Sequence, residues 1–209
     1  MAWLTNVVLE ERTLHAERLE LTDKDSLYFL GPDLRLERCH VVLRVAARNL
    51  LIRRGSRFIG CHFEAKQELK NHQDWVFASL EGCRFQGRFS GCDFGSWPGY
   101  AEGSESGSIE DCDFSQAQLD GCRFMGCDPR TLQLPRWPCF TILHPLQNAP
   151  ALRAVQWPGL FGSVVVEDLH NEPPHTVATT FHAPTVAKRL ETTPEALEAA
   201  LERFDFIFR

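Results

Sequence analysis

A five-residue repeat between residues 107 and 129 constrains the fold of this chain more than any other feature. Within it, Ile109, Phe114, Leu119 and Phe124 follow one another at intervals of five, and a small residue lies two positions before each of them. This period fits neither a helix, which repeats its face every ~3.6 residues, nor a flat strand, which repeats every ~2. It fits a coil of short straight sides, each of which turns one small and one large residue towards a central axis.

A longer repeat extends this arrangement towards the N-terminus. Large apolar residues recur every 22 residues in two series, and cysteines recur at the same interval two positions before the second series. The series are Leu14, Leu36, Phe58 and Leu80; Leu19, Val41, Phe63 and Phe85; and Cys39, Cys61 and Cys83. Stacked coils of this length would place each series in one column. We therefore expect a β-helix over residues 1–134, with a loop insertion at 97–107 that is rich in Gly, Ser and Glu.

The five-residue blocks stop near Pro135, so residues 135–209 are expected to form a small α/β or helical segment that caps the open end of the coils. Its proline-rich beginning, 135–150, predicts irregular structure, and 161–166 is compatible with a strand. A short helix is expected over 185–190. Thr193, with the proline and glutamate that follow it, predicts the start of a helix over about 193–204. Its apolar stripe, a contact for the cap or for a homodimer, is Leu197, Leu201 and Phe204.

The eight cysteines are interpreted as reduced residues that line the core. Most of them occupy the small position of a repeat, no CxxC pair occurs, and free cysteine behaves as a small, buried hydrophobic residue. The N-terminus lacks the pattern of a secretory signal, and no apolar run is long enough to cross a bilayer. We therefore expect a cytoplasmic protein without a membrane partner.

Charge is unevenly distributed along the chain, whose net charge is −6. Residues 91–128 contain eight acidic residues and one basic residue, a net charge of −7, whereas residues 1–60 contain ten basic and eight acidic residues, a net charge of +2. An acidic surface repels nucleic acid and favours a basic protein partner. The candidate partner-binding residues are Asp93, Trp97, Tyr100, Glu102, Glu105, Glu110, Asp111, Asp113, Asp120 and Asp128.

No catalytic, nucleotide-binding or metal-binding motif stands out. His170, His175 and His182 lie within thirteen residues of one another, but their spacing matches no known zinc pattern, so solvated or helix-capping roles are expected. The chain also lacks a P-loop and a GxGxxG sequence. We therefore expect a protein that is not an enzyme and that uses no metal or other cofactor.

The blocks CDFSQ, AQLDG, CRFMG, CRFQG, CDFGS and CHFEA resemble those of the pentapeptide-repeat proteins. The resemblance covers residues 78–129 well and 14–65 loosely, and it does not cover 135–209. It implies an all-β fold, a right-handed quadrilateral parallel β-helix with four blocks per coil. One acidic group of this family resembles the DNA duplex in shape and charge, dimerises through a C-terminal helix and acts on type II topoisomerases.

Two hypotheses for function follow. The first is a non-catalytic protein-binding scaffold, most concretely an immunity-type or inhibitor protein that binds a basic partner through an acidic face of the β-helix. The alternative, which the resemblance supplies, is a DNA mimic that protects or inhibits a type II topoisomerase. Against this alternative, the first 60 residues are slightly basic and the C-terminal segment is large.

Overall fold

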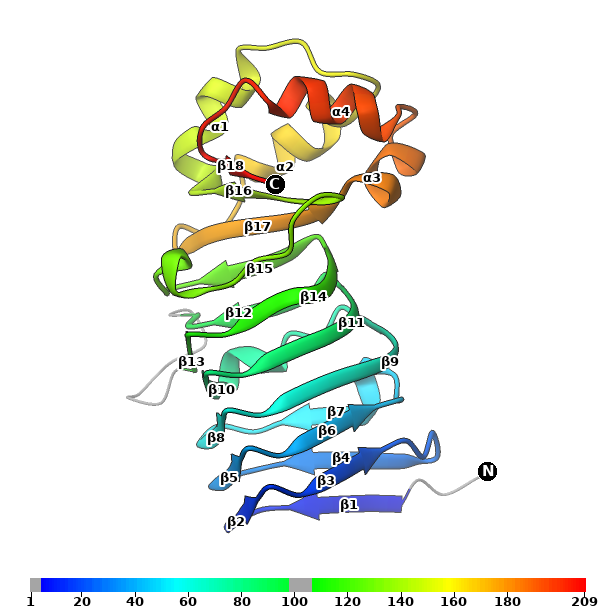
Figure 1. The fold of residues 1–209 in the computed structure, drawn as a ribbon, viewed down its shortest axis with the longest axis vertical. Coiled ribbons are helices and arrows are strands. Elements are labelled where there is room, and N and C mark those ends of the chain that lie inside the picture. Colours follow the sequence, from blue (N-terminus) through cyan, green and yellow to red (C-terminus); the bar gives the residue numbers. More distant parts are fainter. Residues whose placement is uncertain (1–4, 98–106) are drawn as a thin grey trace.

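The structure, a computed structural model, describes residues 5–97 and 107–209. Its strands wind as successive coils along one axis, and helices gather at the C-terminal end of the stack (Figure 1). The strands of the coils are β1 Thr5–Leu9, β2 Arg12–His15, β3 Arg18–Leu21, β4 Ser26–Leu30, β5 Leu34–Glu37, β6 His40–Leu43, β7 Leu50–Ile52, β8 Ser56–Ile59, β9 His62–Lys70, β10 Ala78–Glu81, β11 Arg84–Ser90, β12 Asp93–Gly95, β13 Ser108–Glu110, β14 Asp113–Asp120 and β15 Cys122–Met125.

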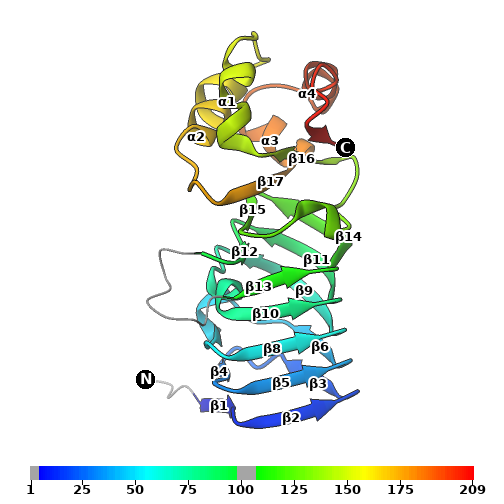
Figure 2. The ribbon, with the colours of Figure 1, turned by 90° about the vertical axis from the view of Figure 1, so that its left-hand side faces the viewer.

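Three parallel sheets form the sides of the stack, in the strand orders β1-β4-β7, β2-β5-β8-β10-β13 and β3-β6-β9-β11-β14. Figure 2 shows the second of these sheets face on. Each of the first three coils contributes one strand to each sheet, and the next two coils extend only the second and third sheets, so residues one coil apart become neighbours. Leu36, for example, pairs in register with Leu14 on one side and Phe58 on the other. The columns predicted from the 22-residue series, and with them the stacked parallel β-solenoid, are confirmed.

The sides predicted from five-residue blocks are partly fused. β11 carries two inward residues, Phe85 and Phe89, and its register to β9 shifts between Gly87 and Phe89. Gly87 has a φ of 105°, and a Cβ there would lie 2.3 Å from the carbonyl oxygen of Ala65. The chain can therefore turn this corner without leaving the sheet only because residue 87 has no side chain.

Aromatic rings fill the centre of the solenoid. Phe85 stacks on Phe63 at 5.2 Å and on Phe114 at 4.5 Å between ring centroids, and Phe94 stacks on Phe124 at 5.4 Å. None of these five side chains is measurably exposed. Burial of a phenylalanine contributes roughly 1.5–3 kcal/mol, so these two columns of rings are a main source of the stability of the stack.

The cysteines lie in the core, as expected. All eight are free thiols, and seven of them are buried, whereas Cys127 is partly exposed. Several donate hydrogen bonds to carbonyl oxygens of the preceding coil: Cys61 Sγ to Leu36 O at 3.3 Å and Cys83 Sγ to Phe58 O at 3.2 Å. A buried thiol therefore fills the small position and also binds the neighbouring coil.

The C-terminal segment covers one end of the solenoid. Its strand β17 (Thr176–His182) pairs antiparallel with β15, and the sheet continues in the order β12-β15-β17-β16-β18. The remaining strands and main helices are β16 Cys139–Leu143, β18 Ile207–Phe208, α1 Pro145–Arg153, α2 Glu167–Leu169, α3 Ala183–Arg189 and α4 Pro194–Leu201. β17 occupies the edge that β15 would otherwise expose to other chains. Among the described helices, none is long and apolar enough to cross a membrane.

Two local expectations for this segment were wrong. The stretch 135–150 is not irregular throughout, because it contains β16 and the start of α1. The stretch 161–166 is not a strand, because Gly162–Val166 form a π-helical turn that continues into α2. Its buried residues Phe161, Val165 and Leu169 are four apart, so helical spacing brings them into one apolar cluster.

The helices expected over 185–190 and from residue 193 are present as α3 and α4. Thr193 Oγ1 accepts a hydrogen bond from the backbone N–H of Ala196 at 3.2 Å, which confirms the predicted N-cap. Leu197 and Leu201 are fully buried, and Phe204, just beyond α4, stacks on Trp157 at 5.8 Å. The predicted stripe therefore packs inside the C-terminal segment, and its leucines present no surface to a second copy.

Candidate binding surfaces

Asp93 corrects the prediction of a continuous acidic face. Its side chain is 1% exposed, and Arg123 occupies both carboxylate oxygens, at 2.7 Å from Nε and 2.8 Å from Nη2. Arg123 also lies 3.4 Å from the Glu172 carboxylate, just before β17, and its guanidinium lies 5.3 Å from the centre of the Trp97 ring. Asp93 thus belongs to a buried network that joins the last coils to the cap, where a partner cannot reach it.

The loop candidates can be followed only in part. Trp97 is half-buried against Arg123. Tyr100, Glu102 and Glu105 lie outside the described residues.

Three further predicted acids are engaged locally. Asp113 lies 3.3 Å from Nε of Arg84 on the neighbouring coil, and Asp120 accepts a hydrogen bond from the backbone N–H of the last residue of β17 at 3.2 Å. Asp128 forms a two-pronged pair with Arg130, whose hydrogen bonds lower the pKa of the carboxyl to about 2. The ion pairs of Asp113 and Asp128 partly neutralise the charge that the sequence concentrates in this region.

Glu110 and Asp111 remain exposed, and the structure adds Glu81 to them. Glu81 and Glu110 face each other in register on β10 and β13, and Asp111 follows at the corner of the coil with a φ of 52°. None of the three carboxylates forms an ion pair with a residue in 5–97 or 107–209. We call these three residues the acidic corner. Glu81 lies outside the acidic stretch of the sequence. It follows Leu80 of the 22-residue series as Glu110 follows Ile109 of the five-residue repeat, and this equivalence could have placed it beside Glu110.

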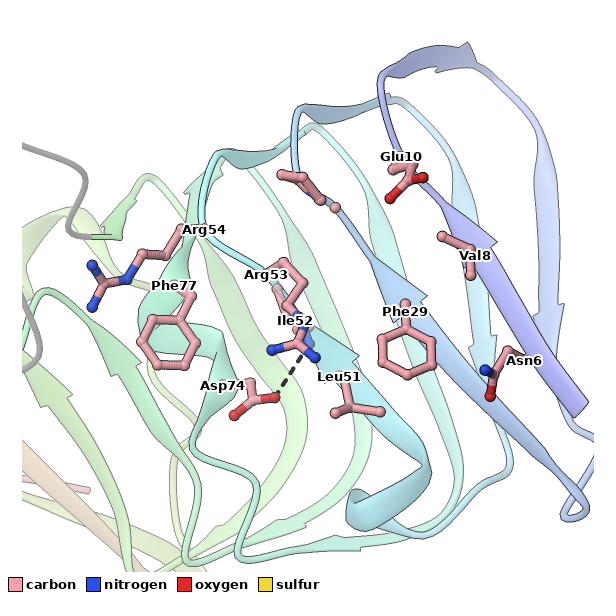
Figure 3. A pocket seen from close by; sticks show the side chains of 12 residues that line it. Asn6, Val8, Glu10, Phe29, Leu51, Ile52, Arg53, Arg54, Asp74 and Phe77 are labelled. Atoms are coloured by element: carbon pink, nitrogen blue, oxygen red, sulfur yellow. Dashed lines mark hydrogen bonds between the residues drawn. The ribbon is translucent and has the colours of Figure 1, made fainter. Parts of the chain in front are cut away.

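A second surface, which the sequence did not predict, lies on the outer face of the sheet β1-β4-β7. Val8, Phe29 and Leu51 are in register on its three strands and form an apolar row. They line a groove of about 800 Å³ (Figure 3). Val8 is 43% exposed, and Phe29 and Leu51 are half-buried. We call this hollow the apolar groove.

Charged residues border the apolar groove at its β7 end. The guanidinium of Arg53 lies 5.5 Å from the centre of the Phe29 ring, and that of Arg54 lies 5.6 Å from the centre of the Phe77 ring. Asp74, in the 3-10 helix η2 (Asp74–Phe77), accepts a hydrogen bond from the backbone N–H of Ile52 at 3.3 Å. Burial raises the pKa of the Asp74 carboxyl. An apolar floor with guanidinium groups at its edge suits a ligand that has an apolar body and an anionic group.

The three C-terminal histidines are separated in the structure. His182 Nδ1 contacts Thr185 Oγ1 at 2.8 Å, whereas His170 Nε2 contacts Arg153 at 2.8 Å. Within residues 5–97 and 107–209, no group of three or more His, Cys, Asp or Glu side chains is arranged to hold a metal ion.

Comparison with known proteins does not extend the description of this chain beyond its fold. No family model, no curated protein and no solved structure matches this chain. The chain is therefore described as a β-solenoid with a helical cap, and its function is argued from its surfaces.

Proposed function

We propose that this chain is a non-catalytic binding protein of the pentapeptide-repeat type, which contacts a basic partner protein through its acidic corner. An immunity-type or inhibitor role is the most concrete form of this proposal. The observation that carries it is the pairing of Glu81 with Glu110, two like charges in register on adjacent strands beside a third, Asp111. Like charges on neighbouring positions of adjacent strands are destabilising.

Lysine or arginine side chains of a partner would relieve this repulsion. They would also meet a corner whose backbone is already fixed, because the N–H of Gly82 donates a hydrogen bond to the carbonyl oxygen of Glu110 at 3.0 Å. A corner with a fixed backbone loses little backbone freedom on binding, and its three carboxylates attract a basic partner over several ångströms. The arrangement thus costs stability in the free protein and favours a complex.

Charge reversal tests the proposal. The triple variant E81K/E110K/D111K and the wild type, each immobilised at the same density, are exposed to lysate from the cells that produce the protein. We expect one or more basic proteins to bind the wild type and to be lost from the variant, and we expect this capture to weaken as salt is added.

A control variant with the same change in net charge distinguishes an effect of the acidic corner itself from an effect of the overall charge of the protein. It reverses three exposed acids of the C-terminal segment: Glu191, Glu195 and Asp205. We expect it to capture the same proteins as the wild type. Equal capture by the acidic-corner variant, with an unchanged circular dichroism spectrum, would show that the corner is not the contact.

DNA mimicry directed at a type II topoisomerase is the second function that the family resemblance predicts. The pairing of Asp93 and Asp128 with arginines reduces the free negative charge on which such mimicry depends. A supercoiling assay with the purified protein tests it directly, and inhibition or protection of the topoisomerase at micromolar protein would favour this function over the first.

A further inference from the structure

The apolar groove differs from the other outer surfaces of the solenoid. On the adjoining sheet, the corresponding outward row is polar along its whole length: Thr13, Arg35, Arg57, Ser79 and Ser108. In the groove, three outward positions in register are apolar, and Val8 is one of the few large apolar side chains in the described residues that solvent reaches freely. An apolar row on the outer face does not contribute to the core of the solenoid. Apolar patches on an outer surface mark interaction sites.

Arg53 gives the groove a directional polar contact. Figure 3 shows its side chain between Phe29 and Asp74 at the edge of the groove. Its guanidinium forms no hydrogen bond and no ion pair with any described residue. It lies 5.5 Å from the centre of the Phe29 ring, and its charge acts on the Asp74 carboxyl, where it opposes the effect of burial on the pKa. A guanidinium carries five N–H donors in a planar fork that matches a carboxylate, so these donors are available to an anionic group on a bound partner.

We propose that the apolar groove docks a segment of a partner protein in which a carboxylate lies beside an aromatic or branched aliphatic side chain. The apolar side chain rests on Val8, Phe29 and Leu51, and the carboxylate pairs with Arg53. Glu10, at the β1 end of the groove, repels an acid placed there and so fixes the direction of the segment. This site lies on a different sheet from the acidic corner and has the opposite charge preference.

The shape of the groove favours a protein segment over a small molecule. Its floor is the outer face of a sheet, which covers one side of a ligand, whereas small-molecule sites enclose about 70–90% of the ligand surface. The groove also crosses three neighbouring strands and reaches η2. Neighbouring strands of a sheet lie about 4.8 Å apart. A segment several residues long can cover this distance and gain contact area through its length.

Selection from a displayed library of random peptides against the full-length chain tests the proposal. We expect enriched peptides to share an Asp or Glu within about two positions of an aromatic or branched aliphatic residue. One such peptide is then synthesised with a fluorophore, together with a copy in which the acid is replaced by its amide. Fluorescence anisotropy measures the binding of both to the wild type and to Arg53→Met, which keeps the apolar stem of the side chain.

The expected result is a coupling between the two changes. Either change alone weakens binding by about tenfold or more, and the second change then adds little, because both remove the same charge-assisted contact. Arg57→Met is the matched control, since Arg57 is an exposed arginine on the adjoining sheet, and it leaves the affinity unchanged. Val8→Asp, which places a charge on the floor, abolishes binding.

Several outcomes overturn the proposal and are distinct from a failure of the acidic corner. These are the absence of any enriched peptide, enrichment without a shared acid, and equal affinities for the wild type and Arg53→Met. Loss of peptide binding in E81K/E110K/D111K but not in Arg53→Met assigns the peptide to the acidic corner instead. Dimerisation that rises with concentration and is abolished by Val8→Asp identifies a second copy of the chain as the occupant.

Discussion

The buried histidine at position 72 predicts that acid destabilises the solenoid in a defined pH range. His72 is 2% exposed, and its Nδ1 accepts a hydrogen bond from the backbone N–H of Asp74 at 3.2 Å, while its Nε2 has no hydrogen-bond partner within the described chain. Its ring stacks on the fully buried Trp75 at 5.5 Å. Protonation would place a charge in this apolar site and would convert the accepting nitrogen into a donor. Burial therefore lowers the pKa of His72 from 6.5 to about 4.

The sign and size of the effect follow from this shift. The unfolded chain binds the proton more tightly than the folded chain, so stability is complete above pH 6.5, falls as the pH drops through the interval to about 4, and is constant below it. A difference of about 2.5 pKa units corresponds to about 3 kcal/mol in total. About 2 kcal/mol of this is lost between pH 7.5 and pH 5.

Urea unfolding at pH 7.5 and at pH 5, followed by tryptophan fluorescence, measures this loss in the wild type and in His72→Asn. Asparagine can still accept the Asp74 N–H but does not titrate, so the variant is expected to lose about 2 kcal/mol less than the wild type over this interval. Its lower stability at pH 7.5 does not affect the comparison, because the readout is the change with pH. His175→Asn, at an exposed histidine, should retain the full loss. Equal losses in the wild type and His72→Asn would refute the reasoning.

Three further predictions concern the coils and the cap. Arg123→Met leaves the Asp93 carboxylate buried without its partner and should destabilise the protein by about 3–5 kcal/mol in urea unfolding, whereas an unchanged midpoint would contradict the role of this pair. Gly87→Ala should cost about 3 kcal/mol or more, because its Cβ would meet the carbonyl oxygen of Ala65 on the preceding coil, whereas Gly82→Ala, where the Cβ meets nothing within 4 Å, should cost about 1 kcal/mol. In the native protein at pH 8, Ellman's reagent should modify at most Cys127, which is partly exposed and whose pKa is raised to about 12 by burial. In guanidinium all eight thiols should react. Rapid reaction of several thiols in the native protein would contradict their burial.

The inward residues of the solenoid could be predicted because their spacing is set locally. Each coil must return to the same axis, so a residue that faces inward in one coil is followed by another one coil later. Leu36 and Phe58 are in register for this reason, and Cys61 lies where a small residue is required. The same local rule predicted the start of α4, because the Thr193 cap depends only on its own neighbours.

The surfaces were harder to predict because they depend on what covers each coil. Asp93 occupies an outward position, which the repeat alone makes polar and exposed, but Arg123 and the cap enclose it. The strand expected at 161–166 fails for a similar reason. Its valines favour a strand by propensity, but the apolar cluster of the cap accepts Val165 and Val166 from a helical turn.

The apolar groove was not predicted from the sequence, because the inward and the outward residues of the strands that form it were not distinguished. Tyr28 and Leu30 face inward in β4, so Phe29 between them must face outward. The sequence contains this alternation, but the groove appears only when Phe29 is placed beside Val8 and Leu51 on neighbouring coils.

The proposal that the acidic corner binds a basic protein is tested most directly by calorimetric titration of a purified captured partner at two salt concentrations. We predict that E81K/E110K/D111K binds at least about tenfold more weakly than the wild type and that its affinity depends less on salt. The control variant with Glu191, Glu195 and Asp205 reversed should match the wild type in both respects. Equal affinity and equal salt dependence of the acidic-corner variant and the wild type would contradict the proposal.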